Sequence, residues 1–141
     1  GAAQLDRHGN INVSKFGNRF AGVGGFINIS QSARRLVFCG TFTSGEAEYA
    51  IENGLLKILR EGRTRKFVRE VVQLCFNAAR ANQRGQRVLY VTGRAVFEAR
   101  PEGLALTELA PGIDLERDVL AQMEFRPIVH QIRPMPAHGF Q

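Results

Sequence analysis

Asn53 and Gly54 divide a stretch, Glu46–Gly62, in which apolar and polar residues alternate on both sides. An Asn-Gly pair between alternating arms favours the type I′ turn, whose two central residues need a positive φ. The stretch therefore predicts an antiparallel two-stranded hairpin. Glu52, directly before the turn, is also a candidate catalytic carboxylate, but the hairpin accounts for it without any chemistry.

Other short runs also predict strands. Ala2–Lys15 predicts two short strands joined across Asp6–Gly9. Further strands are expected over Arg35–Thr43, Lys66–Phe76, Val88–Thr92, Ala95–Ala99 and the residues after the Pro101–Gly103 turn. Because Arg35–Thr43 is apolar on both faces, we expect it in the centre of a sheet.

Few helices are expected. A helical turn ends near Arg34, with Ser30, Gln31 and Ser32 as candidate caps. A second helix follows Asp114, which can cap it, and carries an apolar stripe that includes Val119 and Met123. From Arg126 onward, closely spaced prolines predict an extended tail.

The chain has 141 residues, 44% of them hydrophobic, which is enough for the core of one domain. The pattern predicts a strand-rich α/β fold with hairpins and one or two helices. A free-standing α/β domain normally carries more helices than this. We therefore expect the chain to be part of a larger sheet.

A formal net charge of +6 is compatible with nucleic acid, an anionic membrane or a phosphate-bearing ligand as a partner. The densest basic run, Arg60–Glu70, contains a single aromatic residue and lacks the aromatic interleaving of a single-strand binding surface. No apolar run approaches the roughly 20 residues that a membrane span needs. We expect neither a nucleic-acid nor a membrane partner, and a basic non-catalytic binding module remains an alternative.

The thiols and imidazoles do not predict a metal site. Cys39 and Cys75 lie in apolar runs without a Cys-x-x-Cys motif, which favours reduced core residues in a cytoplasmic protein. His8, His130 and His138 have no ligand-like spacing with cysteines or carboxylates.

A glycine-rich segment, Ala21–Ser30, carries Gly22, Gly24 and Gly25. It fits neither the dinucleotide-binding G-x-G-x-x-G pattern nor a P-loop. Glycines at such spacing let a ligand come close to main-chain N–H groups, which can stabilise an anion or a developing oxyanion. A tight structural turn is the alternative, and the residues alone leave both open.

Three blocks in order, "GAAQLDRHGNINVSKFGNRFAGVGGFINIS", "VLYVTGRAVFE" and "GLALTELAPGIDLERDVLAQMEFRP", resemble the C-terminal part of the family I CoA-transferases. The likeness extends over about Gly1–Val129 and is greatest to the single-chain bacterial acetate/propionate enzymes. It implies that residues 1–126 are the C-terminal part of an open-sheet catalytic domain, followed by a tail over 127–141.

The resemblance implies a ping-pong transfer of CoA between a short-chain acyl-CoA and a carboxylic acid such as acetate. A glutamate attacks the thioester, and a glutamyl-CoA thioester forms by way of an acyl-glutamyl anhydride. By likeness, Gly22, Gly24 and Gly25 line the CoA site, and the Gly25 N–H is the oxyanion donor. Gln4 and Asn28 also match the family, with no role carried over. CoA is then a substrate rather than a bound cofactor.

The resemblance also implies partners. They are acyl-CoA, short-chain carboxylates, the upstream part of the same enzyme, and further copies in a homo-oligomer. The family nucleophile lies upstream of the first block, beyond Gly1, whereas Glu52 lies downstream of the glycine segment and follows Ile51 where the ketoacid branch has serine. Gly93 stands where the family usually has an acidic residue. A divergent thioester hydrolase that uses Glu52 is a further alternative.

Overall fold

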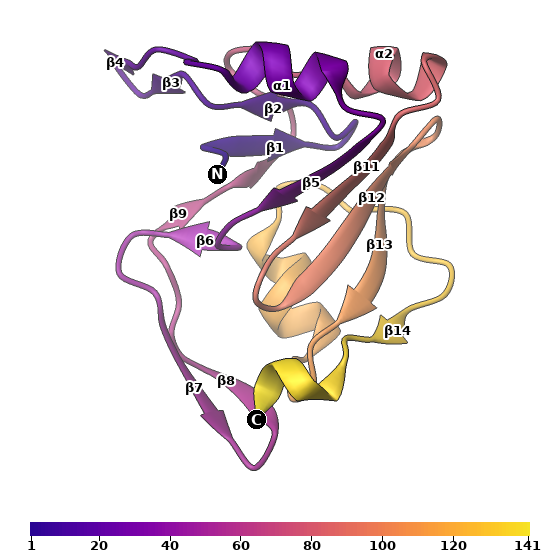
Figure 1. Ribbon diagram of the computed structural model, residues 1–141. Helices are drawn as coiled ribbons and strands as arrows, with labels where there is room; N and C mark the ends of the chain where they lie inside the picture. The colour runs from indigo at the N-terminus through magenta and orange to yellow at the C-terminus, as the bar shows by residue number, and fades with distance from the viewer.

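A five-stranded sheet is the largest element of the computed structural model, which describes residues 1–141 (Figure 1). Its strand order is β14-β13-β12-β11-β5. The strands are β5 (Arg35–Cys39), β11 (Arg87–Val91), β12 (Ala95–Arg100), β13 (Gly103–Leu109) and β14 (Arg133–Pro134). The β11–β12–β13 meander is antiparallel, whereas β5 runs parallel to β11 and β14 parallel to β13.

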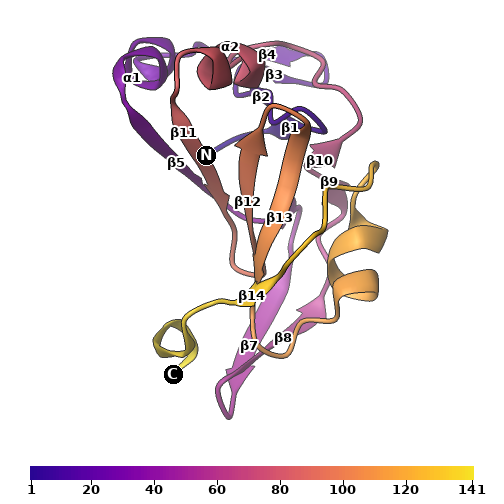
Figure 2. The ribbon, with the colours of Figure 1, turned by 90° about the vertical axis from the view of Figure 1, so that its right-hand side faces the viewer.

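Smaller sheets surround it. A three-stranded sheet has the order β10-β1-β2, with β1 (Gln4–Asp6), β2 (Ile11–Asn12) and β10 (Phe67–Val68). Three pairs complete the strands: β3 (Lys15–Phe16) with β4 (Arg19–Phe20), β6 (Thr43–Ser44) with β9 (Thr64–Arg65), and β7 (Glu48–Glu52) with β8 (Leu55–Arg60). Helices α1 (Phe26–Ser32) and α2 (Ala78–Gln83) lie at one end, and the β7–β8 hairpin extends from the other (Figure 2).

The core is formed by apolar side chains from distant parts of the sequence. Phe42 and Phe67 stack with ring centroids 4.6 Å apart, and Phe97 lies 4.8 Å from Phe67. Val119 and Met123, from the helical segment after β13, are buried in the same cluster. The core therefore joins the two main sheets and the helical segment into one unit.

The locally encoded elements form as expected. Asn53 and Gly54 have φ values of 53° and 76°, so the hairpin closes through two positive-φ residues and Glu52 is the last residue of its first arm. The strands expected at Val88–Thr92 and Ala95–Ala99 agree with β11 and β12 to within one residue.

Strand β5 was expected in the centre of a sheet, which is wrong for this chain. It lies at the edge, and Val37 is 56% exposed. Cys39, expected in the core, is also exposed, while Cys75 is partly buried, and both are free thiols.

The strand expected over Lys66–Phe76 is also largely wrong. Only Phe67 and Val68 are in β10. The N–H of Val71 donates to Asp6 Oδ2 at 3.3 Å, and that of Val72 donates to Gln4 Oε1 at 3.1 Å. Side chains of β1 thus accept the hydrogen bonds that the backbone of a neighbouring strand would otherwise accept.

Helix α2 was not expected, although Asn77 caps it by accepting from Arg80 N–H at 3.0 Å, and Gly85 follows it with a φ of 71°. Helix α1 begins at Phe26, earlier than expected, so the serines lie inside it and do not cap its start. Ser30 Oγ instead donates to Ile27 O at 3.1 Å.

The segment after β13 is helical as expected, but as a π-helical turn, η1 (Leu115–Val119), followed by a 3-10 turn, η2 (Leu120–Gln122). Asp114 accepts from Arg117 N–H at 2.7 Å, as a cap does. The boundary at residue 126 remains a prediction. Beyond it, Ile128 exchanges backbone hydrogen bonds with β13, and Phe140 of η3 (Ala137–Phe140) is buried.

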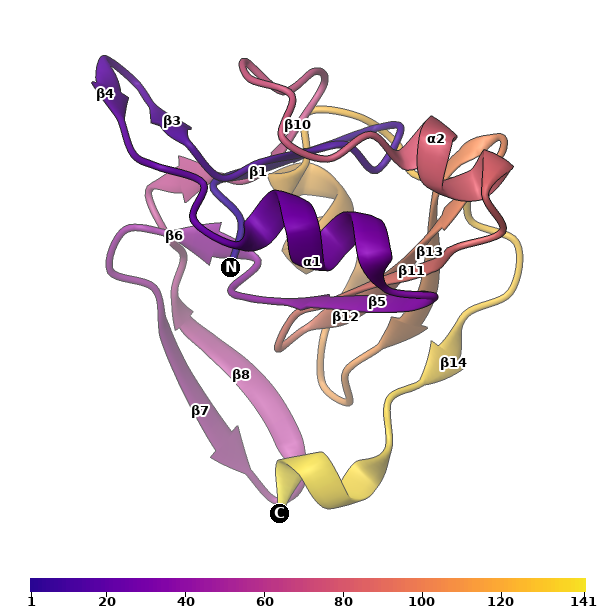
Figure 3. The ribbon, with the colours of Figure 1, turned by 45° about the horizontal axis from the view of Figure 1, so that its top comes forward.

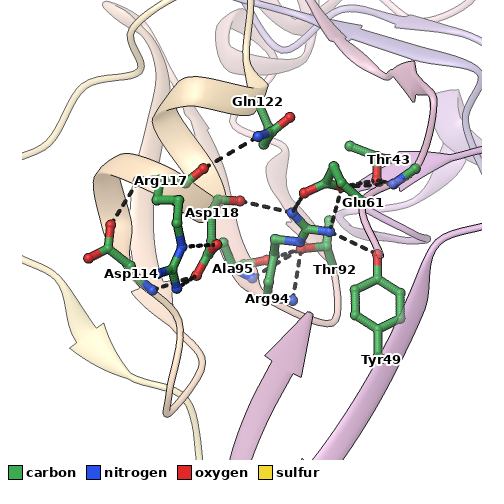
Figure 4. A network of polar contacts seen from close by, with 11 residues as sticks. Thr43, Tyr49, Glu61, Thr92, Arg94, Ala95, Asp114, Arg117, Asp118 and Gln122 are labelled. Carbon is green, nitrogen blue, oxygen red and sulfur yellow. Dashed lines mark hydrogen bonds and ion pairs between the residues drawn. The ribbon is translucent and has the colours of Figure 1, made fainter. Parts of the chain in front are cut away.

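Arg94, in the turn between β11 and β12, forms a buried polar network (Figure 4). Its side chain is 1% exposed and donates to both oxygens of Glu61, at 2.8 and 3.0 Å. It also donates to the backbone oxygen of Asp118 and to the hydroxyl of Tyr49, each at 2.9 Å. Burial alone would raise the pKa of Glu61, but the hydrogen bonds and charge of Arg94, with Thr43, hold it below its ordinary value.

Gly112 lies in close contact with β8 of the hairpin, and a substitution there tests how tightly the two pack. Its φ is 86°, and an added Cβ would lie 2.7 Å from Leu56 O and 3.0 Å from Leu55 Cβ. We expect Gly112→Ala to reduce the free energy of unfolding by about 2 kcal/mol, measured by urea denaturation. The reason is that alanine is strained at a positive φ and that its Cβ would clash with the backbone of β8. Gly93→Ala is the matched control, since nothing lies within 4 Å of its Cβ position and its φ is not positive. Equal effects of both substitutions would contradict the close contact.

Glu61→Gln tests the buried pair. We expect a loss of about 3 kcal/mol of unfolding free energy at neutral pH, because the substitution leaves the charge of Arg94 buried without a counter-charge. The folded-state pKa of Glu61 lies below 4.5, so its stabilising effect is complete above that pH and is lost as the pH falls through the lower value. The difference between wild type and variant should therefore shrink in acid.

The control for this experiment is Glu52→Gln. The ion pair of Glu52 with Lys57 is exposed on both sides, at 53% and 51%, and should contribute less than about 1 kcal/mol. If the two variants unfolded at the same urea concentration, the buried pair of Arg94 and Glu61 would stabilise the fold no more than the exposed pair does.

Candidate functional site

The glycine segment connects β4 to α1 and is exposed at Gly22, Gly24 and Gly25. Gly24 has a φ of 54° and is the one glycine of the three in the left-handed region. Phe26 N–H donates to Val23 O at 3.1 Å, which closes the turn ahead of the helix. The sequence thus places a turn at Gly24 and starts the helix directly after Gly25.

The three glycines leave open space and free donors. A Cβ at Gly22 or Gly24 would meet nothing within 4 Å, and one at Gly25 would meet only Ile29 Cδ1, at 3.5 Å. The N–H groups of Gly24 and Gly25 donate to no acceptor in the chain. The packing of this chain therefore does not explain glycine at positions 22 and 25, and the free N–H groups can reach a ligand that approaches from outside.

Gln4 and Asn28, which also match the family, lie in different surroundings. Gln4 lies in β1, where its Oε1 accepts from Asn12 Nδ2 at 3.0 Å and from Val72 N–H, so its side chain supports the fold. Asn28 is exposed in the first turn of α1, next to the glycine segment.

Glu52 is not brought to the glycine segment. It lies near the tip of the β7–β8 hairpin, at the opposite end of the molecule from α1 (Figure 1), and pairs with Lys57. An exposed, ion-paired carboxylate without a pocket around it has no arrangement for nucleophilic attack.

A second feature was missed in the sequence. Lys66 is 6% exposed and lines a small, mainly apolar pocket at the carboxyl ends of β5 and β11. Burial lowers the pKa of its ammonium group. The only signal was a single lysine in the arginine-rich run Arg60–Glu70, which looked like a solvated surface.

The glycine segment and the carboxyl end of β5, which lines this pocket, lie toward the same side of the molecule. In Figures 1 and 3 the chain between β4 and α1, the N-terminus and the carboxyl end of β5 all lie on the left. This side therefore combines free backbone donors with a buried cation. No three His, Cys, Asp or Glu side chains converge as metal ligands would. None of the helices has the length and apolar character that crossing a bilayer requires.

Comparison with known proteins gives the family. No family model matches the chain. The acetate CoA-transferase YdiF of Escherichia coli is 45% identical over 127 residues, which is 90% of this chain and 24% of that protein. The caffeate CoA-transferase of Acetobacterium woodii is 47% identical over 134 residues, which is 92% of this chain and 25% of that protein.

Solved structures agree. The acyl-CoA transferase YdiF from E. coli O157:H7, in a thioester complex with CoA, superposes with a TM-score of 0.95 and 41% identity over 99% of this chain and 28% of that one. The glutaconate CoA-transferase of Acidaminococcus fermentans has a TM-score of 0.67 at 19% identity, which shows a shared fold. The chain spans about a quarter of the length of the curated relatives. It is therefore a homologue of one segment of the family I CoA-transferases.

Proposed function

We propose that the complete enzyme containing this segment transfers CoA between a short-chain acyl-CoA and a carboxylate such as acetate. The observation that carries the proposal is the TM-score of 0.95, over 99% of the chain, with an acyl-CoA transferase in a thioester complex with CoA. The names of the two curated relatives, an acetate and a caffeate CoA-transferase, support the reaction class and differ in the acid.

The segment would supply backbone donors rather than the nucleophile. When a carboxylate attacks a thioester, the carbonyl oxygen becomes an oxyanion that needs hydrogen-bond donors already in position. The Gly25 N–H has no acceptor in the chain, Gly25 is exposed, and Gly22 leaves room for a ligand. We assign the oxyanion contact to Gly25, the lining of the CoA site to Gly22, Gly24 and Gly25, and the nucleophilic glutamate to the upstream part of the enzyme.

We also propose partners and a compartment for the complete enzyme. Acyl-CoA and short-chain carboxylates are the substrates, the upstream part completes the active site, and the enzyme is a cytoplasmic homo-oligomer. A hydrolase based on Glu52 has less support, because that carboxylate is exposed and ion-paired on the hairpin. The two curated relatives, an acetate and a caffeate CoA-transferase, give no support to the basic binding module.

The location of the nucleophile can be tested with the chain alone. Purified residues 1–141 should not transfer CoA from acetyl-CoA to propionate, because the segment holds donors without the attacking carboxylate. The complete enzyme, assayed in parallel, should do so. Transfer by the isolated chain, or a borohydride-trapped acyl group on Glu52, would overturn the assignment.

The donor role of Gly25 can be tested in the complete enzyme. Gly25→Pro removes the N–H while its φ of −79° suits proline. We expect kcat to fall by about 100- to 1,000-fold, as when one oxyanion donor is removed, with little change in the melting temperature.

The matched variant is Gly25→Ala, which keeps the N–H and meets only Ile29 Cδ1 at 3.5 Å. It should retain most of the activity. Equal losses in the two variants would show that crowding, and not the missing donor, is responsible.

A further inference from the structure

Strand β5 forms one edge of the five-stranded sheet but has few of the features that protect an edge (Figure 2). It has five residues, neither proline nor lysine, and a single charged side chain at its first residue, Arg35. The strand at the other edge, β14, has two residues and includes Pro134. Proteins keep exposed edge strands short or place proline and charges in them, because a long apolar edge pairs with other strands. Strand β5 therefore has the character of a strand that is paired on both sides.

Every second residue of β5 directs its backbone groups away from the sheet. Gly40, directly after the strand, donates its N–H to Val91 O in β11 at 3.1 Å. In a parallel pair, residues that bond to one neighbour alternate with residues whose N–H and C=O point the other way. The even-numbered residues of β5 therefore bond to β11. The backbone groups of Arg35, Val37 and Cys39 point to the open edge, where the sheet has no further strand.

The two faces of β5 differ in how they are covered. On one face Leu36 is buried, and the ring centroid of Phe38 lies 5.7 Å from that of Phe26 in α1. On the other face Val37 is exposed, and Leu89, its register partner on β11, is only half-buried. Strands of parallel sheets are apolar on both sides because both faces of such sheets are covered. The second face of β5 has the apolar side chains for such a cover, but this segment does not supply it.

We propose that the upstream part of the enzyme adds a strand to the open edge of β5, parallel to it, and covers the face that carries Val37 and Leu89. The inference rests on the proposal that this chain belongs to a longer enzyme, and not on the reaction of that enzyme. The chain spans about a quarter of the length of its curated relatives, so the remaining residues are sufficient for a strand and its cover.

A second copy of this chain is the competing occupant of the edge. Two copies that pair through the same edge strand normally do so in the antiparallel sense. Antiparallel sheets can leave one face in water and do not call for apolar residues on both faces. The parallel pairing of β5 with β11 and the apolar character of both faces favour a parallel strand from the same polypeptide.

The first experiment measures amide hydrogen exchange in the complete enzyme, by mass spectrometry that resolves single residues. Leu36 and Phe38 should exchange slowly in any case, because their N–H groups bond to β11. If a further strand is present, the amides of Val37 and Cys39 should exchange at rates within roughly 10-fold of those two. Exchange that is faster than this at Val37 and Cys39 would overturn the proposal.

The second experiment identifies the occupant. A photoreactive diazirine analogue of leucine replaces Val37 in the complete enzyme, and the cross-linked peptides are sequenced after irradiation. The analogue should cross-link to a peptide upstream of this chain, in a product with the mass of one polypeptide. A product with the mass of two polypeptides, a cross-link confined to residues 1–141, or reaction with water alone would each overturn the proposal.

The third experiment compares two equally exposed valines. Val37→Gln should lower the melting temperature of the complete enzyme by about 5 °C, because it places an amide under an apolar cover. The matched control is Val72→Gln, since Val72 is 55% exposed against 56% for Val37 but follows β10, away from this edge.

An unchanged melting temperature in Val37→Gln would contradict the cover. If that variant does not fold, hydrogen exchange in the wild-type enzyme still decides. None of these measurements depends on activity, so a wild-type enzyme without CoA transfer would overturn the proposed function and not the added strand.

Discussion

The buried guanidinium of Arg94 connects three parts of the fold that lie far apart in the sequence. It lies in the turn between β11 and β12 and reaches Glu61 after β8, Tyr49 on β7 and the backbone of Asp118 in η1 (Figure 4). Within the β7–β8 hairpin only Leu56 is buried, so apolar packing alone holds the hairpin weakly. Because a buried charge needs its counter-charge, the pair of Arg94 and Glu61 sets where the hairpin sits relative to the sheet.

Local signals predicted the parts of the fold that depend on neighbouring residues. Asn53-Gly54 and the Pro101–Gly103 turn each specify a hairpin connection within a few residues, and the strands on both sides follow. The strand predicted over Lys66–Phe76 does not form beyond Val68, because residues far away in the sequence determine its hydrogen bonds. The side chains of Gln4 and Asp6, more than 60 positions away, take the backbone donors of Val71 and Val72. No propensity or periodicity in the run itself contains that information.

Part of the candidate site is likewise visible in the sequence, and part depends on distant contacts. Glycines at positions 22, 24 and 25 stand out in the sequence, and the resemblance to a family implies a role for them. Lys66 did not stand out, since its burial follows from a contact with Thr41, 25 positions earlier, and from the way β5 and β11 end together. A charged residue acquires an unusual environment only through such contacts, so composition places it on the surface by default.

The two buried cations differ in whether their counter-charge lies within this segment. Arg94 has its counter-charge within the chain and serves the fold. Lys66 has none within the chain and donates to the backbone of Thr41, while the N–H groups of Gly24 and Gly25 have no acceptor within the chain. Backbone donors without an acceptor and a cation without an anion are both complementary to a negatively charged group. Both features therefore call for a negatively charged group from outside this segment.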